Sequence, residues 1–194
     1  NASVPLYADG PMDFKDVYQG RNQSVRTIAR ARHVQGALVS TTRTQYINFE
    51  NAWGEGIDLR VYPSWIGIRK VIVVNAVPTT TALALNFDFI VQTSEPIADG
   101  DTSQTWTQSS DLDFTTRQAR IGDILIKPAL WWDSGGPRST VPIRFAERNG
   151  KTLLRKTVPL GLLNKATLPF FTDDDFNFDA GSGTGSVTKS GGDW

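Results

Sequence analysis

The chain contains no cysteine, a single histidine and a single methionine among its 194 residues. Without cysteine there is no disulfide framework and no thiolate nucleophile, and a reducing compartment is expected. Zinc sites need several Cys or His ligands, so we expect no metal centre. A Ser-His-Asp triad would have to use His33, which stands at the start of an apparent strand beside two arginines. These absences predict a protein without ordinary enzyme chemistry and without a cofactor.

The chain also lacks net charge, and no apolar run reaches the ~18 residues that a membrane-spanning helix needs. Its charges are nevertheless segregated. Residues 21–43 hold five arginines and no acid, whereas residues 172–194 hold five aspartates and one lysine. The arginine-rich stretch lacks the interleaved aromatic residues of a single-strand binder, so we expect neither a nucleic-acid nor a membrane partner. A solvated or protein-docking arm is the favoured interpretation.

Most of the chain alternates with the period of a β-strand and is rich in β-branched residues. The most regular strand places Leu83, Leu85, Phe87, Phe89 and Val91 on one inward face. Asn149-Gly150 is a two-residue hairpin signal. Strands are expected at residues 33–39, 44–49, 57–62, 70–74, 83–91, 122–128, 140–146 and 151–158, with a weaker one within 105–114. Short strands joined by turns predict an all-β fold, an antiparallel β-sandwich or jelly roll.

The two ends of the chain differ from this pattern. Residues 1–31 carry scattered apolar residues between Pro and Gly, and they are expected to form an extended N-terminal arm. Residues 32–171 are the expected sandwich. Residues 172–194 contain Asp173-Asp174-Asp175 near their start and continue into a Gly/Ser-rich run, which predicts a flexible acidic tail. A calcium site at these aspartates is the alternative, although their spacing does not match an EF-hand.

Tryptophans and paired carboxylates leave two other functions open. Trp53, Trp65, Trp106 and the Trp131-Trp132 pair lie in or beside expected turns, with residues 131–137 read as an aromatic-tipped loop. Such rings can stack on sugars, anchor a protein interface, or pack at the edge of the core. Glycosidases use two carboxylates across a cleft, for which Glu50 with Glu55 or Asp111 with Asp113 are candidates. The alternative function is therefore a carbohydrate-binding module or adhesin.

Residues 35–95 resemble the β-sandwich cement, or decoration, proteins on the heads of tailed bacteriophages. The likeness lies in the Ser/Thr-rich turn of "ALVSTTRTQYINF", a glycine-containing loop, a buried strand from Val71 to Ala76 and an alternating strand that ends in Gln92-Thr93-Ser94-Glu95. It includes no catalytic residues. The resemblance implies a structural virion protein that assembles on the outside of a capsid in the cytoplasm of a host bacterium.

The expected function is therefore capsid decoration, in which protein–protein contacts stabilise the shell by mass action. The expected partners are the major capsid protein and neighbouring copies of the chain itself. The contacts would come from strand-edge pairing, from the arm and from loop aromatics. The candidate interface residues are Tyr7, Phe14, Tyr18, Arg21, Arg26, Arg30, Trp131 and Trp132.

Overall fold

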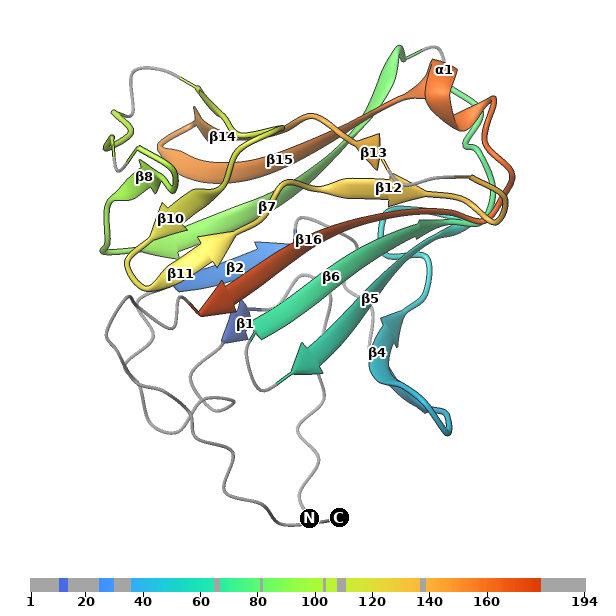
Figure 1. The fold of residues 1–194 in the computed structure, drawn as a ribbon. Coiled ribbons are helices and arrows are strands. Elements are labelled where there is room, and N and C mark those ends of the chain that lie inside the picture. The colour runs from blue at the N-terminus through green and yellow to red at the C-terminus, as the bar shows by residue number, and fades with distance from the viewer. Residues whose placement is uncertain are drawn as a thin grey trace.

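The computed structural model describes residues 11–13, 25–29, 36–64, 67–80, 82–102, 104–107, 111–136 and 139–178. These residues form two antiparallel sheets that pack face to face, so the predicted all-β sandwich is confirmed. Figure 1 shows the sheets as two layers, with β6 and β16 in one layer and β7 and β15 in the other.

The first sheet has six strands. In spatial order they are β1 (Pro11–Asp13), β2 (Val25–Ala29), β7 (Ala84–Thr93), β15 (Lys151–Pro159), β14 (Ile143–Arg148) and β9 (Leu112–Asp113). The hairpin between β14 and β15 turns at Asn149 and Gly150, whose φ angles are +55° and +68°. Two consecutive positive φ angles are what a two-residue hairpin turn requires, which confirms the predicted hairpin.

The second sheet has ten strands. Eight follow one another in the order β3 (Ala37–Ser40), β4 (Gln45–Phe49), β5 (Ile57–Ser64), β6 (Gly67–Val74), β16 (Phe170–Phe178), β11 (Ile124–Ile126), β10 (Ala119–Ile121) and β8 (Ile97–Asp99). The short β12 (Leu130–Trp132) pairs with β16 and with β13 (Ser139–Thr140). A single-turn helix, α1 (Leu160–Leu163), follows β15.

One core lies between the sheets, because each contributes the apolar side chains of its inward face. Phe87, Phe89 and Val91 of β7 are buried there, as the alternation predicted. Leu83 is a correction, since its residue is 90% exposed. The strand begins only at Ala84, and Leu83 lies in the preceding connection, where its carbonyl accepts the amide hydrogen of Leu160.

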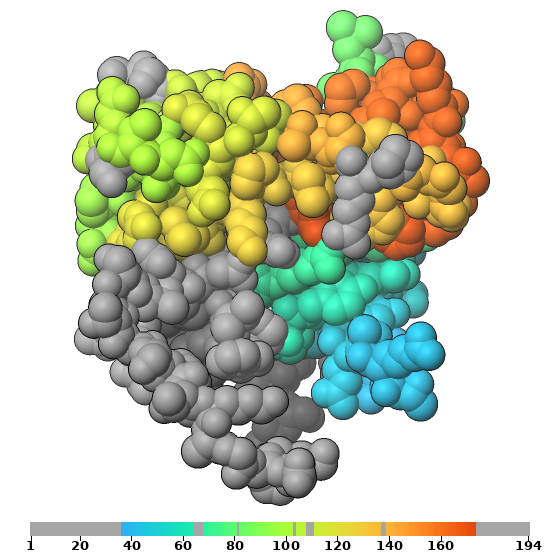
Figure 2. Space-filling view, in the orientation of Figure 1, coloured from blue at the N-terminus to red at the C-terminus, as the bar shows by residue number. Residues whose placement is uncertain are grey.

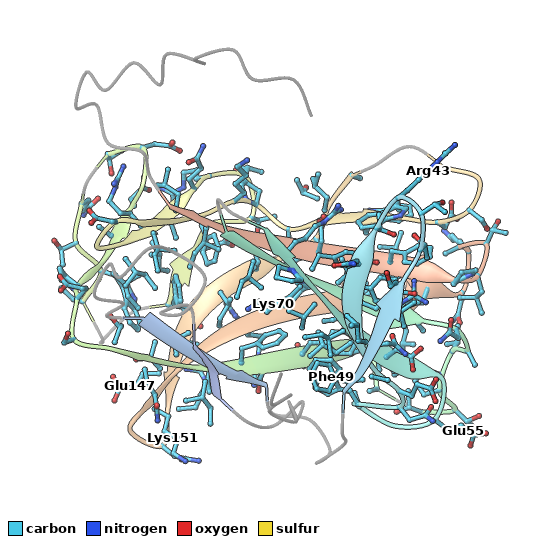
Figure 3. The ribbon with its side chains drawn as sticks, turned by 90° about the horizontal axis from the view of Figure 1, so that it is seen from below. Arg43, Phe49, Glu55, Lys70, Glu147 and Lys151 are labelled. Atoms are coloured by element: carbon cyan, nitrogen blue, oxygen red, sulfur yellow. The ribbon has the colours of Figure 1, made fainter. Side chains whose placement is uncertain are left out.

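Two lysines are part of this interior. Lys70 of β6 is 0% exposed and Lys156 of β15 is 1% exposed. Figure 3 shows Lys70 between the two layers. Its ammonium nitrogen lies 4.1 Å from the ring centroid of Phe89, and an aromatic face attracts a cation. At Lys70 the interior therefore holds a charged group against an aromatic ring.

The described strands extend into the segments expected to form the arm and the tail. The predicted arm contains β1 and β2, and β2 pairs with β7 from Val25↔Thr93 to Ala29↔Phe89. The β-branched residues of Val25–Ala29 favour a strand, whereas this stretch was expected to belong to an extended arm. The predicted tail overlaps β16, which reaches Phe178 between β6 and β11. Asp173, the first of three consecutive aspartates in this strand, is paired with Arg69. The rest of the tail, from residue 179, lies outside the described residues.

Candidate interaction face

The outer face of the second sheet collects arginine and aromatic side chains from strands that are distant in sequence. Residues at alternate positions of β4, β5, β6, β16 and β12 face away from the core. Cross-strand pairing places them in rows, as Tyr46↔Tyr62↔Arg69 and as Asn48↔Arg60↔Val71↔Asp173↔Leu130. Tyr46 and Tyr62 lie one step beyond the Ile47↔Val61 pair of β4 and β5, and their ring centroids lie 5.0 Å apart.

Arg60 is held in place by two neighbours on this face. Its guanidinium carbon lies 5.2 Å from the ring centroid of Tyr46. Its Nε donates to Oδ1 of Asn48 at 3.4 Å. A guanidinium stacked on a ring keeps the edge of its fork available for hydrogen bonds. The terminal amino groups of Arg60 are therefore oriented before any partner arrives.

Arg69 and Asp173 form the centre of the face. Nε of Arg69 donates to Oδ2 of Asp173 at 2.8 Å, and the other oxygen of the carboxylate accepts the backbone amide of Leu130 at 3.2 Å. The Arg69 guanidinium also lies over the ring of Trp132, 5.3 Å from its centroid. The same Trp132 ring stacks on Phe171 at 5.4 Å.

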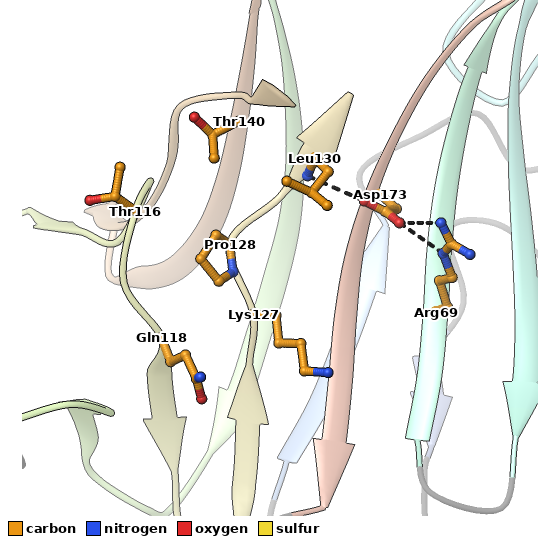
Figure 4. A pocket seen from close by; sticks show the side chains of 8 residues that line it. All are labelled: Arg69, Thr116, Gln118, Lys127, Pro128, Leu130, Thr140 and Asp173. Carbon is orange, nitrogen blue, oxygen red and sulfur yellow. Dashed lines mark hydrogen bonds and ion pairs between the residues drawn. The ribbon is translucent and has the colours of Figure 1, made fainter. Parts of the chain in front are cut away.

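A groove of about 440 Å³ opens beside this ion pair (Figure 4). Asp173, Arg69 and Leu130 border it from one direction, and Lys127 and Pro128 from the segment between β11 and β12. Thr116, Gln118 and Thr140 supply hydroxyl and amide groups to its lining. In this lining Arg69 pairs with Asp173, which also accepts the amide of Leu130, and Lys127 is the second cation.

The β3–β4 hairpin extends beyond the sandwich. Figure 2 shows it (light blue) projecting from the body, and Figure 3 places Arg43 at its tip. Leu38 lies opposite Ile47 and is 72% exposed. Among the described strands β3 pairs only with β4, so it is one edge of the sheet.

The amide directions along β3 follow from its turn. Thr41 donates its amide to the carbonyl of Thr44. Hydrogen-bonded pairs alternate along an antiparallel ladder. Ala37 and Val39 therefore direct their amides at β4, whereas Leu38 and Ser40 direct theirs outward.

The predicted interface residues fall into three groups. Tyr7, Phe14, Tyr18, Arg21 and Arg30 lie outside the described residues. The backbone of Arg26 lies in β2, opposite Gln92 of β7. Trp131 and Trp132 lie on β12 rather than on a loop tip, which corrects the predicted aromatic loop. Trp131 stacks on the buried Phe170 and belongs to the core, while Trp132 belongs to the outer face.

Each described tryptophan packs against phenylalanine. Trp53 meets Phe87 and Phe89 edge-on, and Trp106 lies 6.2 Å from Phe145 between ring centroids. Trp131 and Trp132 also stack on phenylalanine rings. This packing agrees with the interpretation that the tryptophans lie at the edge of the core. Sugar binding needs an aromatic face that the fold leaves uncovered. Trp65 is outside the described residues.

The candidate glycosidase carboxylates serve local structure. Asp111 pairs with Arg144 and Arg148, at 3.3 Å in each case. Asp113 accepts the amide of Thr115 at 2.9 Å, and this hydrogen bond lowers the pKa of Asp113 from its ordinary value. Glu50 and Glu55 are exposed turn residues. The lowered pKa of Asp113 favours its ionised form. The general acid of a glycosidase instead needs a raised pKa, so that it stays protonated.

Comparisons with protein families, with curated proteins and with solved structures found no match to this chain. Among the described residues, no group of three or more His, Cys, Asp or Glu side chains could hold a metal ion. No helix within the described part of the chain is long and apolar enough to cross a membrane.

Sequence reasoning missed Arg60, Arg69 and Asp173 as a group. Alternation in residues 57–62 places Arg60 and Tyr62 on one face, but it does not reveal which strands lie beside β5. Asp173 was assigned to the tail because three consecutive aspartates are typical of solvated segments.

Proposed function

We propose that this chain is a structural protein that works by binding other protein surfaces, in the manner of the cement proteins on bacteriophage heads. The observation that carries the proposal is the edge of β3. Exposed edges of natural sheets are usually blunted by charge, proline or a bulge, because they otherwise pair with other chains. From Gly36 to Thr42 this edge has neither charge nor proline, and Leu38 is 72% exposed.

The position of Leu38 adds to this argument. It lies opposite Ile47, which packs against the core, and the hairpin continues the apolar face of the sheet past the end of the sandwich. A strand from a capsid subunit or from a second copy of this chain could pair with β3 and cover Leu38 at the same time. Backbone pairing supplies affinity in such contacts, and the alternate side chains supply specificity.

The test compares Leu38→Lys with Thr42→Lys in the full chain. Both positions are exposed in the same hairpin, but Thr42 lies in the turn rather than on the strand. Each variant should melt like the parent, because surface substitutions usually change stability by less than about 0.5 kcal/mol. In co-sedimentation with tailed-phage capsids, Leu38→Lys should lose most of its occupancy and Thr42→Lys should keep it. Full occupancy of Leu38→Lys would contradict the β3 edge, and no sedimentation of the parent would contradict capsid binding.

A further inference from the structure

We infer that Asn149, at the tip of the β14–β15 hairpin, is a modification site at which the side-chain amide is lost spontaneously and part of the product becomes isoaspartate. Solvent water is the only co-reactant. Figure 3 labels Glu147 and Lys151, which flank this turn at an outer corner of the molecule. The inference does not rest on capsid binding.

The residue that follows the asparagine is the first argument. The reaction requires the backbone nitrogen of that next residue to reach Cγ of the asparagine side chain. A side chain on the next residue hinders this approach, whereas glycine has none and has the widest choice of backbone conformations. Of the nine asparagines in the chain, only Asn149 precedes glycine.

The surroundings of the turn are the second argument. Asn149 and Gly150 are both exposed. A methyl group on the Cα of Gly150 would meet no atom within 4 Å, so open space surrounds the turn on that side. The closing hydrogen bond of a four-residue turn joins its first and fourth residues, so it does not engage the amide of Gly150. The attacking nitrogen is therefore free to move.

Asn51 provides a comparison within the same molecule. Its φ angle is also +55°, and it is also an exposed turn residue. Its Oδ1, however, accepts the backbone amide of Gly56 at 2.7 Å, and the residue that follows it, Ala52, is 0% exposed. Ring closure at Asn51 would have to break this hydrogen bond and displace a buried residue. The two asparagines therefore share a backbone φ angle but differ in their freedom to react.

The chemistry balances without an oxidant or a reductant. The backbone nitrogen of Gly150 forms a bond to Cγ of Asn149, the bond from Cγ to Nδ2 breaks, and Nδ2 leaves as ammonia with the proton of the Gly150 amide. The product is a cyclic imide. Water then opens the imide at Cγ, which gives aspartate, or at the backbone carbonyl carbon of residue 149, which gives isoaspartate.

The two products differ in their effect on the hairpin. Each adds one negative charge, but isoaspartate also adds a CH2 group to the main chain. Aspartate tolerates the left-handed conformation of Asn149, so it retains the turn. Loop length and turn type fix the register of a hairpin, so the longer main chain of isoaspartate disturbs the Arg148↔Lys151 pair.

The test incubates the full folded chain in mildly alkaline and in mildly acidic buffer, and follows the gain of negative charge by ion-exchange chromatography. Peptide mapping assigns each modified asparagine, and enzymatic methylation marks isoaspartate. Asn51 is the control within the same chain. Asn149→Gln is the matched variant, because glutamine must close a larger ring, and Asn149→Asp supplies the charge without the longer main chain. Incubation in urea gives the rate without the turn.

We expect Asn149 in the folded chain to lose its amide at least about tenfold faster than Asn51, whose hydrogen bond and buried neighbour oppose ring closure. The loss should be faster in alkaline buffer, because the attacking nitrogen must give up its proton, and Asn149→Gln should gain no charge at this position. Asn149→Asp should melt like the parent, and the isoaspartate fraction should melt at a lower temperature.

Three results would overturn the inference. The first is equal loss of amide at Asn149 and Asn51 in the folded chain. The second is an Asn149 that persists in the folded chain while it reacts in urea, because the turn would then protect it. The third is an isoaspartate fraction that melts like Asn149→Asp, because the longer main chain would then leave the hairpin intact.

Discussion

Arg69 and Asp173 are 104 residues apart in the sequence, yet they form an ion pair across β6 and β16, with Nε of the arginine 2.8 Å from Oδ2 of the aspartate. The Asp173 side chain is only 7% exposed, and Leu130 donates its backbone amide to the other oxygen. One carboxylate therefore connects three strands, β6, β16 and β12. This explains how an aspartate can occupy an inner strand of the sheet.

Removing the charge of Asp173 should destabilise the fold. Asp173→Asn keeps the shape of the side chain but weakens charge-assisted hydrogen bonds, which contribute about 1.5 to 3 kcal/mol each, and Arg69 is partly exposed. We expect the free energy of unfolding to fall by about 2 kcal/mol in urea titrations. Asp101→Asn, at an exposed loop position, is the control and should change it by less than about 0.5 kcal/mol. An unfolding curve for Asp173→Asn that matches the control would contradict the structural role of the ion pair.

Phe87 and Leu83 should respond very differently to truncation, although the alternation of the sequence places both on one face. Phe87 is 2% exposed and packs edge-on against Trp53 at 5.3 Å. Phe87→Ala should cost about 3 to 5 kcal/mol of unfolding free energy. Leu83 is 90% exposed, so Leu83→Ala should be nearly neutral. Thermal and urea unfolding measure both, and a stable Phe87→Ala protein would mean that β7 does not contribute this residue to the core.

Stability should fall in acid, because several carboxyls are ionised at unusually low pH in the folded chain. The amides of Asp101 and Thr102 donate to Asp99 and, with Arg117 nearby, lower its pKa from the ordinary 3.8. Amides of Thr167 and Gly135 likewise lower the pKa of Asp133. A lowered folded-state pKa adds stability above the ordinary value, and that stability is lost as pH falls through the lower, folded value.

Melting temperature measured from pH 6 down to about pH 2 should therefore drop most steeply below the ordinary carboxyl value. Asp99→Asn should melt lower at neutral pH and depend less on pH in this range. Asp123→Asn, at an exposed turn, should follow the parent curve. If Asp99→Asn and the parent lose stability in parallel, the hydrogen bonds to Asp99 do not contribute in this way.

Alternation in the sequence was enough to predict the sandwich class, most strands and the Asn149-Gly150 hairpin. It works because one face of each strand is buried, and β7 from Phe87 to Val91 is the clearest example. It placed Leu83 in the core because a periodic pattern does not show where a strand begins. It assigned β2 to the arm because a strand of five residues leaves only a weak signal in the sequence.

The candidate interaction face was not predictable from local patterns. Its residues meet only through long-range pairing, such as β6 with β16 and β16 with β12. Asp173 in particular was read as part of a tail, since the stabilising partner Arg69 lies on another strand. The tryptophans were expected in or beside turns. The stacking of Trp131 on Phe170 could not be predicted, because it depends on which strand lies beside β12.

Amide hydrogen exchange at β3 tests the proposed assembly most directly. In the free chain, Ala37 and Val39 should exchange slowly because their amides point at β4, whereas Leu38 and Ser40 should exchange quickly because theirs point outward. On assembled capsids, Leu38 and Ser40 should become protected while Ala37 and Val39 change little. That alternate pattern is what pairing with a partner strand predicts. If Leu38 and Ser40 exchange as fast on the capsid as in the free chain, the β3 edge is not the site of assembly.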